Sequence, residues 1–165
     1  MNSYPKIIIH GFHALKYLTL RKAINLLQLR LSYIFSQRES LIKSNASPSF
    51  ISVEPYNFCQ LQCPECPVSQ RKATEKAFIN EKVYFKTIDE LKEKLIHVIF
   101  YFQGEPLLNK KLPEMIQYAH KQRIFTSTST NAQALNPEMA REIVLSGLDK
   151  LIISIDGSTQ EVYEQ

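Results

Sequence analysis

Three cysteines within eight residues are the part of this chain best suited to chemistry. They stand in the segment Cys59-Gln-Leu-Gln-Cys63-Pro-Glu-Cys66, and the chain has no other cysteine. Thiolates are soft ligands, and cysteine runs this compact hold iron–sulfur clusters. Three thiolates are one fewer than a closed four-cysteine site, so a four-iron cluster held here keeps one iron open. The spacing C-x3-C-x2-C therefore favours a [4Fe–4S] cluster on Cys59, Cys63 and Cys66.

Two plainer interpretations stay open at this point. A structural zinc site needs four protein ligands, and none of the histidines is spaced like a finger partner of the cysteines. Those histidines are His10, His13, His97 and His120. Unliganded or redox-active thiols are the other interpretation. A disulfide would leave one thiol over, and C-x2-C pairs rarely form structural bridges in intracellular chains.

Three short polar motifs each stand at the end of a β-rich run. They are Gln103-Gly-Glu-Pro106, Ser129-Thr-Asn131 and Ser154-Ile-Asp-Gly157. Each motif alone is explained equally well as a turn or a capped loop. Together with the cysteine loop, however, they follow four successive strands. Barrel folds assemble their sites at the carboxyl ends of strands, so we expect one site there.

Strands and helices alternate beyond residue 50. The β-rich runs are 50–53, 97–102, 124–130 and 151–155, and the second is apolar enough for a strand buried on both faces. Helices are expected between and after these runs. The first has the apolar stripe Tyr84, Ile88, Leu91 and Leu95, and Asn109 can cap the second. The third starts at Asn136-Pro137 and stops at Gly147, and the capping box Ser158-x-x-Glu161 opens the fourth. This alternation predicts the α/β class, with parallel strands and right-handed crossovers.

Residues 1–49 form a separate arm. Residues 1–43 hold seven Lys or Arg against one acid, whereas the rest holds 13 basic and 15 acidic residues. The net charge of +4 therefore comes from the arm. The arm lacks any nucleic-acid-binding signature, so we expect no nucleic-acid partner. Leu20, Ile24, Leu27, Leu31 and Ile34 follow a helical stripe. A basic amphipathic helix can lie on an anionic membrane surface. Stripes at helical spacing usually face a core, however, so we expect the helix to pack on the protein's own core or on a partner. Charges interrupt the apolar run before it could span a bilayer.

With the cysteines placed in the loop after the first strand, residues 50–165 resemble the radical S-adenosylmethionine (radical SAM) superfamily. The motif Gln103-Gly-Glu-Pro106 is similar to the family's Gly-Gly-Glu-Pro. The sequence from Ser154 to Tyr163 and the helical arm look most like the SPASM-type subgroup. That subgroup carries an extra cluster-binding C-terminal domain. The resemblance implies a truncated core, a partial (βα) barrel with about four of the six βα units of such cores.

The resemblance also implies cofactors and roles. A [4Fe–4S] cluster on the three cysteines and SAM are expected, and reductive cleavage of SAM gives a 5′-deoxyadenosyl radical that abstracts hydrogen from the substrate. Gly104 lets the backbone approach the ligand, and Glu105 accepts a hydrogen bond from the methionine ammonium. Ser154 and Asp156 resemble positions that reach the ribose or methionine end, and Asn131 lies at the same rim.

Two positions depart from the family's pattern. Glu65 replaces the aromatic residue that often precedes the last cysteine, and Gln103 replaces the first glycine of Gly-Gly-Glu-Pro. Both bear on SAM affinity and neither is a cluster ligand. A non-catalytic zinc-binding or interaction module is the competing interpretation of the whole chain.

The partners follow from the same resemblance. It implies a one-electron donor such as flavodoxin or ferredoxin, and a substrate that these residues leave open, with peptide modification as the common role in the resembling group. An open cluster and free thiols require a reducing compartment, so we expect a cytoplasmic protein.

Overall fold

A parallel β-sheet organises the molecule. The structure is a computed structural model that describes residues 15–36, 46–61, 63–70, 75–155, 157 and 159–163. Its strands pair in the order β1-β2-β3-β4, all parallel. They are β1 (Phe50–Ser52), β2 (His97–Ile99), β3 (Phe125–Thr130) and β4 (Lys150–Ile153). The predicted α/β class is confirmed, with the neighbouring strands expected of the first four units of a barrel.

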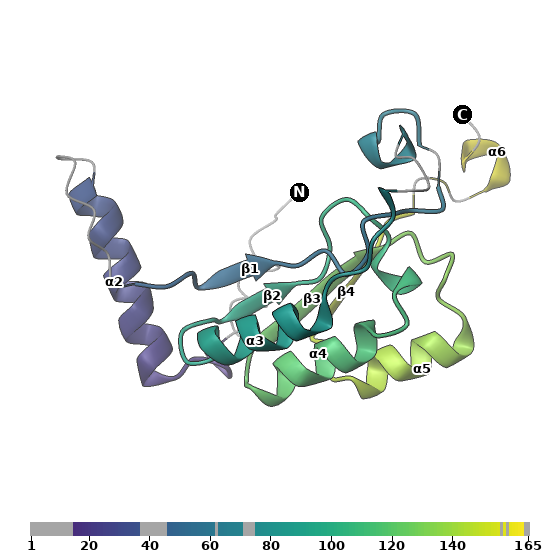
Figure 1. The fold of residues 1–165 in the computed structure, drawn as a ribbon. Helices are drawn as coiled ribbons and strands as arrows, with labels where there is room; N and C mark the ends of the chain where they lie inside the picture. The colour runs from purple at the N-terminus through teal and green to yellow at the C-terminus, as the bar shows by residue number, and fades with distance from the viewer. Residues whose placement is uncertain are drawn as a thin grey trace.

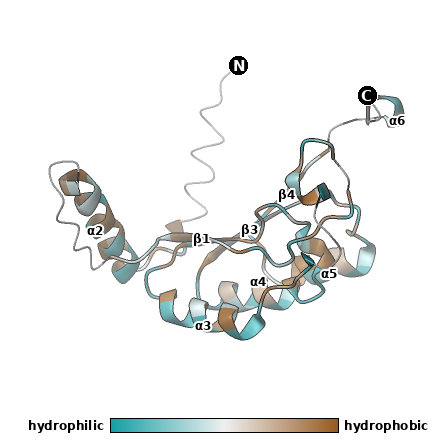
Figure 2. Ribbon diagram, turned by 45° about the horizontal axis from the view of Figure 1, so that its top comes forward, coloured by the Kyte–Doolittle hydropathy of each residue, from teal (hydrophilic) through white to brown (hydrophobic). Residues whose placement is uncertain are grey.

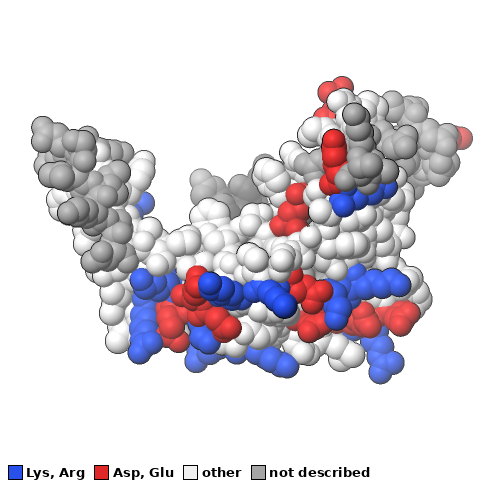
Figure 3. All heavy atoms as spheres, in the orientation of Figure 1, with Lys and Arg blue, Asp and Glu red and all other residues white. Residues whose placement is uncertain are grey.

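Three helices cover one face of the sheet (Figure 1). They are α3 (Glu81–Leu91), α4 (Leu112–Lys121) and α5 (Pro137–Leu145). Their apolar stripes contribute Ile88, Met115 and Ile143 to one core cluster with Val98 of β2 and Phe100 just after it. Lys, Arg, Asp and Glu side chains gather in a band over the outer side of this helix layer (Figure 3). The core therefore lies between sheet and helices.

Short elements complete the chain. They are the 3-10 turns η1 (Pro67–Gln70) and η3 (Pro106–Leu108) and the helix α6 (Gln160–Tyr163). The predicted start of α5 is confirmed, because the Asn136 side chain accepts a hydrogen bond from the Met139 N–H and Pro137 follows it. Gly147, with φ +79°, ends that helix as expected. The capping box at Ser158 lies outside the described residues.

Two expectations near β2 are wrong. The strand ends at Ile99, so the run 97–102 is only half strand. Val98 is buried against the helices, whereas His97 and Ile99 on the opposite face are half-buried, because no described element covers that face. Asn109 does not cap α4, whose N-cap is Lys111. Its side chain instead accepts from the Lys111 N–H and donates to the Pro55 carbonyl, which fixes the turn before the helix.

The helix of the arm, α2 (Leu20–Ser36), lies beside the amino-terminal ends of the strands (Figure 1). It packs through polar side chains. The Asn25 amide pairs with both backbone groups of Ser47, at 2.9 Å each, and the Lys22 ammonium donates to the Arg123 carbonyl. Burial lowers the pKa of Lys22 to about 8.

The apolar stripe of α2 faces away from the domain, so it does not pack on the domain's own core, and packing on a partner stays a prediction. Hydrophobic residues recur along the helix in Figure 2, and the stripe is exposed, from 42% at Leu31 to 78% at Leu20. The physical reason is that Lys22 and Asn25, on the opposite side, satisfy backbone groups of the domain. Across the described residues, no helix is long and apolar enough to cross a membrane.

Candidate functional site

A cavity of about 250 Å³ opens at the carboxyl ends of the strands. The predicted site residues that line it come from all four strand ends: Cys59, Cys63, Gly104, Glu105, Asn131 and Ser154. Positions up to 95 residues apart in the chain thus share one hollow. The sequence predicts one site at the strand ends, and this cavity lies there.

The cysteine loop contributes two of its three cysteines to the lining of the cavity. Cys59 and Cys63 line it, whereas Cys66 does not. The Cys66 N–H donates to the Cys63 carbonyl at 3.0 Å, which closes a turn between them. All three thiols are free of disulfides, and burial raises the pKa of the Cys59 thiol. Within the described ranges, no group of three His, Cys, Asp or Glu is arranged to hold a metal.

Gly104 is where the turn after β2 meets the cysteine loop. A Cβ on Gly104 would lie 1.9 Å from the Tyr56 carbonyl oxygen and 3.0 Å from the Phe58 nitrogen. The neighbouring Glu105 N–H donates to the Phe58 carbonyl at 2.8 Å. Besides lining the cavity, Gly104 therefore allows two loops to pack backbone against backbone.

Glu54 is a site residue that sequence reasoning missed. One carboxylate oxygen, Oε1, accepts from the backbone N–H groups of Gln103 and Gly104, at 2.9 and 2.8 Å. Glu54 lies two residues after the end of β1, so it links the segment before the cysteine loop to the turn after β2. Its position at a strand end was the available signal, but a lone acid carries no spacing pattern.

Glu105 is buried, at 3% exposure, and its carboxylate already has three donors. Oε1 accepts from the Leu107 N–H at 3.0 Å and the Thr130 hydroxyl at 2.6 Å. Oε2 accepts from the Asn131 N–H at 3.0 Å. The carboxylate thus fixes the end of β3 against the turn after β2. Its predicted bond to a methionine ammonium stays a prediction.

Asn131 and Ser154 lie at the end of β3 and just after β4. The Asn131 side chain donates to the Cys59 sulfur, at 3.5 Å, and accepts from the Gln60 side chain, at 3.0 Å. The Ser154 N–H donates to the Thr130 carbonyl and continues the ladder between the strands. Asp156, also predicted for the site, lies outside the described residues.

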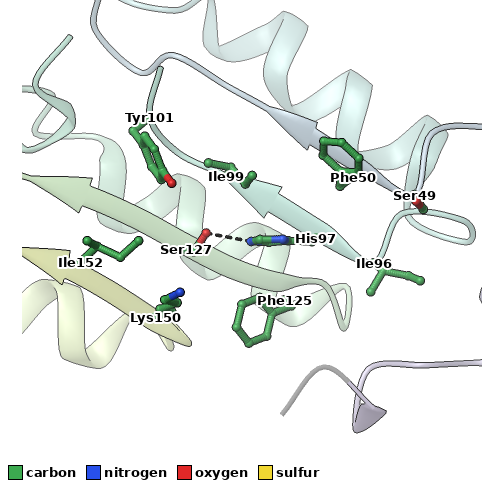
Figure 4. A pocket seen from close by; sticks show the side chains of 10 residues that line it. All are labelled: Ser49, Phe50, Ile96, His97, Ile99, Tyr101, Phe125, Ser127, Lys150 and Ile152. Atoms are coloured by element: carbon green, nitrogen blue, oxygen red, sulfur yellow. Dashed lines mark hydrogen bonds between the residues drawn. The ribbon is translucent and has the colours of Figure 1, made fainter. Parts of the chain in front are cut away.

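A second cavity, of about 380 Å³, lies on the open face of the sheet (Figure 4). His97 Nε2 is 2.7 Å from the Ser127 hydroxyl inside it. Burial, followed by the nearby Lys150 ammonium, lowers the pKa of His97, which favours the neutral imidazole. Tyr101 lines both this cavity and the one beside the cysteines, so the two hollows adjoin along one face.

The family of this chain follows from comparison with known proteins. Residues 53–165 match the profile described as "Radical SAM superfamily", and the chain belongs to that superfamily. The resemblance predicted from the cysteine loop and the strand-end motifs is confirmed.

Relatives of known sequence include three enzymes. PqqA peptide cyclase of Granulibacter bethesdensis is 29% identical over 109 residues, 65% of this chain and 29% of the relative. Mycofactocin maturase MftC of Mycobacterium ulcerans is 30% identical over 104 residues, 63% and 28% of the two chains. Fe-coproporphyrin III synthase of Methanosarcina barkeri is 29% identical over 99 residues, 60% and 25%. The match thus spans less than a third of each relative.

Solved structures agree on the fold. A crystal structure of BtrN in complex with AdoMet and 2-DOIA superposes with a TM-score of 0.55 and 25% identity, over 71% of this chain and 51% of that one. A structure of BtrN in an open conformation gives 0.57 and 22%, over 72% and 55%.

The residues present fit the cofactors of the superfamily, a [4Fe–4S] cluster and SAM. The donor set consists of soft thiols, and none is engaged in a disulfide. Two of them share a cavity with a buried carboxylate and with backbone groups at strand ends.

Proposed function

We propose that this chain is the core of a radical SAM enzyme, with the cluster on Cys59, Cys63 and Cys66. The observation that carries the proposal is the cavity, where Cys59 and Cys63 meet Gly104, Glu105 and other strand-end residues of the family's motifs. When bound, the cluster supplies one electron for cleavage of SAM, which yields a 5′-deoxyadenosyl radical able to abstract hydrogen.

The chain's own residues hold and shield this site. Glu54 and Gly104 fix the turn after β2 against the cysteine loop. Glu105 offers a carboxylate whose position is set by three donors, which suits it to a charge-assisted bond with the methionine ammonium. Ser154, and Asp156 after it, are assigned to the ribose or methionine end. Cys66 lies in the same loop, where its backbone N–H donates to the Cys63 carbonyl, and it is assigned as the third ligand.

Substrate, electron donor and location extend this proposal. A peptide substrate is supported by the relative named PqqA peptide cyclase, and the same likeness supports the SPASM-type subgroup. A one-electron donor such as flavodoxin or ferredoxin, and a reducing cytoplasm, suit an open cluster. Contact of α2 with an anionic membrane surface is supported by its exposed stripe, which Arg21 and Arg30 flank.

Anaerobic reconstitution with iron and sulfide tests the cluster. The protein should take up about four irons per chain and show a broad visible absorbance that dithionite bleaches. Each of the variants Cys59→Ala, Cys63→Ala and Cys66→Ala should lose both the iron uptake and the visible absorbance, because two thiolates do not hold the cluster. Ser129→Ala, at the same cavity but without a sulfur, is the matched control and should retain its iron.

The same measurement separates the competing interpretations. Stoichiometric zinc with no iron uptake would support a non-catalytic zinc-binding module. Neither metal would support an interaction module. Full iron and sulfide in any one of the three cysteine variants would overturn the ligand assignment.

A further inference from the structure

The Asn131 side chain reaches the sulfur of one predicted cluster ligand. Its Nδ2 donates to Cys59 Sγ at 3.5 Å, within the range for a hydrogen bond to sulfur. Both residues line the cavity at the strand ends. Asn131 comes from the end of β3 and Cys59 from the loop after β1, so the contact joins positions 72 residues apart.

The orientation of this amide is fixed by its other side. Asn131 Oδ1 accepts from the Gln60 side chain and from the Gln133 backbone N–H, at 3.0 Å each. Turning the amide over would place a donor against both of these donors. The hydrogen-bond network therefore determines that the N–H₂ group faces Cys59.

The backbone at Asn131 is held as well. Its N–H donates to the buried Glu105 carboxylate at 3.0 Å. Ala132 follows with φ +63°, in the left-handed region, and its N–H donates to the Thr130 hydroxyl. A non-glycine residue adopts this conformation at a cost, so the turn is held by its surroundings. The donor is thus positioned by the fold and not by the sulfur alone.

A hydrogen bond to a cysteine sulfur of a cluster changes the reduction potential of that cluster. Residues that bond to metal ligands orient them and tune the metal, and hydrogen bonds to sulfur are among the determinants of cluster potential. The reduced cluster is the more negative, so an N–H donor stabilises it more than the oxidised form. The donor raises the reduction potential and makes the electron easier to load.

We propose that Asn131 is a positioning residue that raises the reduction potential of the cluster through its hydrogen bond to Cys59. This inference rests on the proposed function, because it assumes the cluster on the three cysteines. It gives Asn131 a role that differs from a direct SAM contact, since the amide is already engaged with sulfur and with Gln60.

The test is a redox titration of the reconstituted, SAM-free protein, followed by EPR of the reduced cluster. Asn131→Leu keeps the volume and removes the donor without adding charge. We expect the equilibrium constant for reduction to fall about tenfold, which for a one-electron couple is about 59 mV toward more negative potential. Gln133→Ala is the matched control, because its backbone N–H remains, and its potential should equal that of the unchanged protein.

A second variant guards against a folding defect in the first. Asn131→Asp keeps the oxygen that accepts from Gln60 and Gln133 and replaces the donor with a charged oxygen, so its potential should fall at least as far as that of Asn131→Leu. A direct readout is pulse EPR on protein labelled with ¹⁵N in its Asn side chains. A ¹⁵N coupling to the reduced cluster should appear in the unchanged protein and vanish in Asn131→Asp.

The outcomes separate this inference from the proposed function. Absence of any cluster in the unchanged protein would overturn both. A full cluster whose potential is the same in Asn131→Leu, Asn131→Asp and the unchanged protein, without a ¹⁵N coupling, would overturn the role of Asn131 alone.

Discussion

At the scale of single residues, the site depends on contacts between backbones. Gly104 lies against the Tyr56 carbonyl, and the Glu105 N–H bonds to the Phe58 carbonyl. Glu54 holds the same turn from the other side through two N–H groups. The cysteine loop and the turn after β2 therefore form one packed unit, in which a methyl group at position 104 has no space.

Gly104→Ala should separate this unit. A Cβ 1.9 Å from a carbonyl oxygen forces the backbone to move, and overpacking of this kind costs about 1–3 kcal/mol or more. We expect a lower free energy of unfolding in urea and reduced cluster uptake. Gln103→Ala keeps its backbone N–H to Glu54 and should lose much less. Equal stability of Gly104→Ala and the unchanged protein would show that the two loops do not pack as described.

The sequence predicted part of this residue-scale picture. The cysteines, Gly104, Glu105 and Asn131 all belong to motifs that follow strands, and the cavity contains residues from each motif. Glu54 could not be predicted, because its partners are backbone groups 49 and 50 positions away, which leave no trace in the residue types. The donor from Asn131 to Cys59 was missed for the same reason: it depends on how two loops meet.

At the scale of elements, α2 shows where periodicity misleads. The stripe predicted the helix correctly but not its buried face, because a stripe indicates which face is apolar and not what covers it. The buried face was decided by backbone groups of the domain: Arg123, with φ +58°, offers its carbonyl to Lys22, and Ser47 offers both of its groups to Asn25. The positions of these backbone groups of Arg123 and Ser47 cannot be deduced from the sequence.

A pair of adjacent substitutions in α2 tests this arrangement. Asn25→Ala removes two hydrogen bonds to the backbone of the half-buried Ser47, and each such bond contributes about 0.5–1.5 kcal/mol to stability. Ile24→Ala removes a side chain that is 47% exposed and should change stability by no more than about 0.5 kcal/mol. Urea unfolding of both variants should therefore rank the polar residue above the apolar one. The reverse order would indicate that the stripe faces the core after all.

At the scale of the whole molecule, one face of the sheet carries the helices (Figure 1), and the other carries the cavity that His97 lines (Figure 4). The cavity beside the cysteines lies at the carboxyl ends of the strands, and Tyr101 lines both cavities. The strand order and the helix layer followed from the alternating pattern, since parallel strands need crossovers and crossovers place helices on a face. What packs on the open face of the sheet could not be predicted, because the periodicity of a strand shows which of its faces is apolar and not what covers that face. Among the described strands, β1 and β4 are the edges.

The edge at β4 leads to a prediction about self-association. Ile153 on β4 is 44% exposed and Leu151 is 36% exposed, and an apolar edge strand pairs readily with another chain. Ile153→Lys should raise the dissociation constant of self-association at least about tenfold, because burying a charge in an apolar contact costs more than about 1.4 kcal/mol. Val144→Lys makes the same change on α5, at a side chain that is 77% exposed, and should leave association unchanged. Sedimentation velocity over a range of concentrations measures both, and equal effects of the two lysines would show that net charge, and not the β4 edge, controls association.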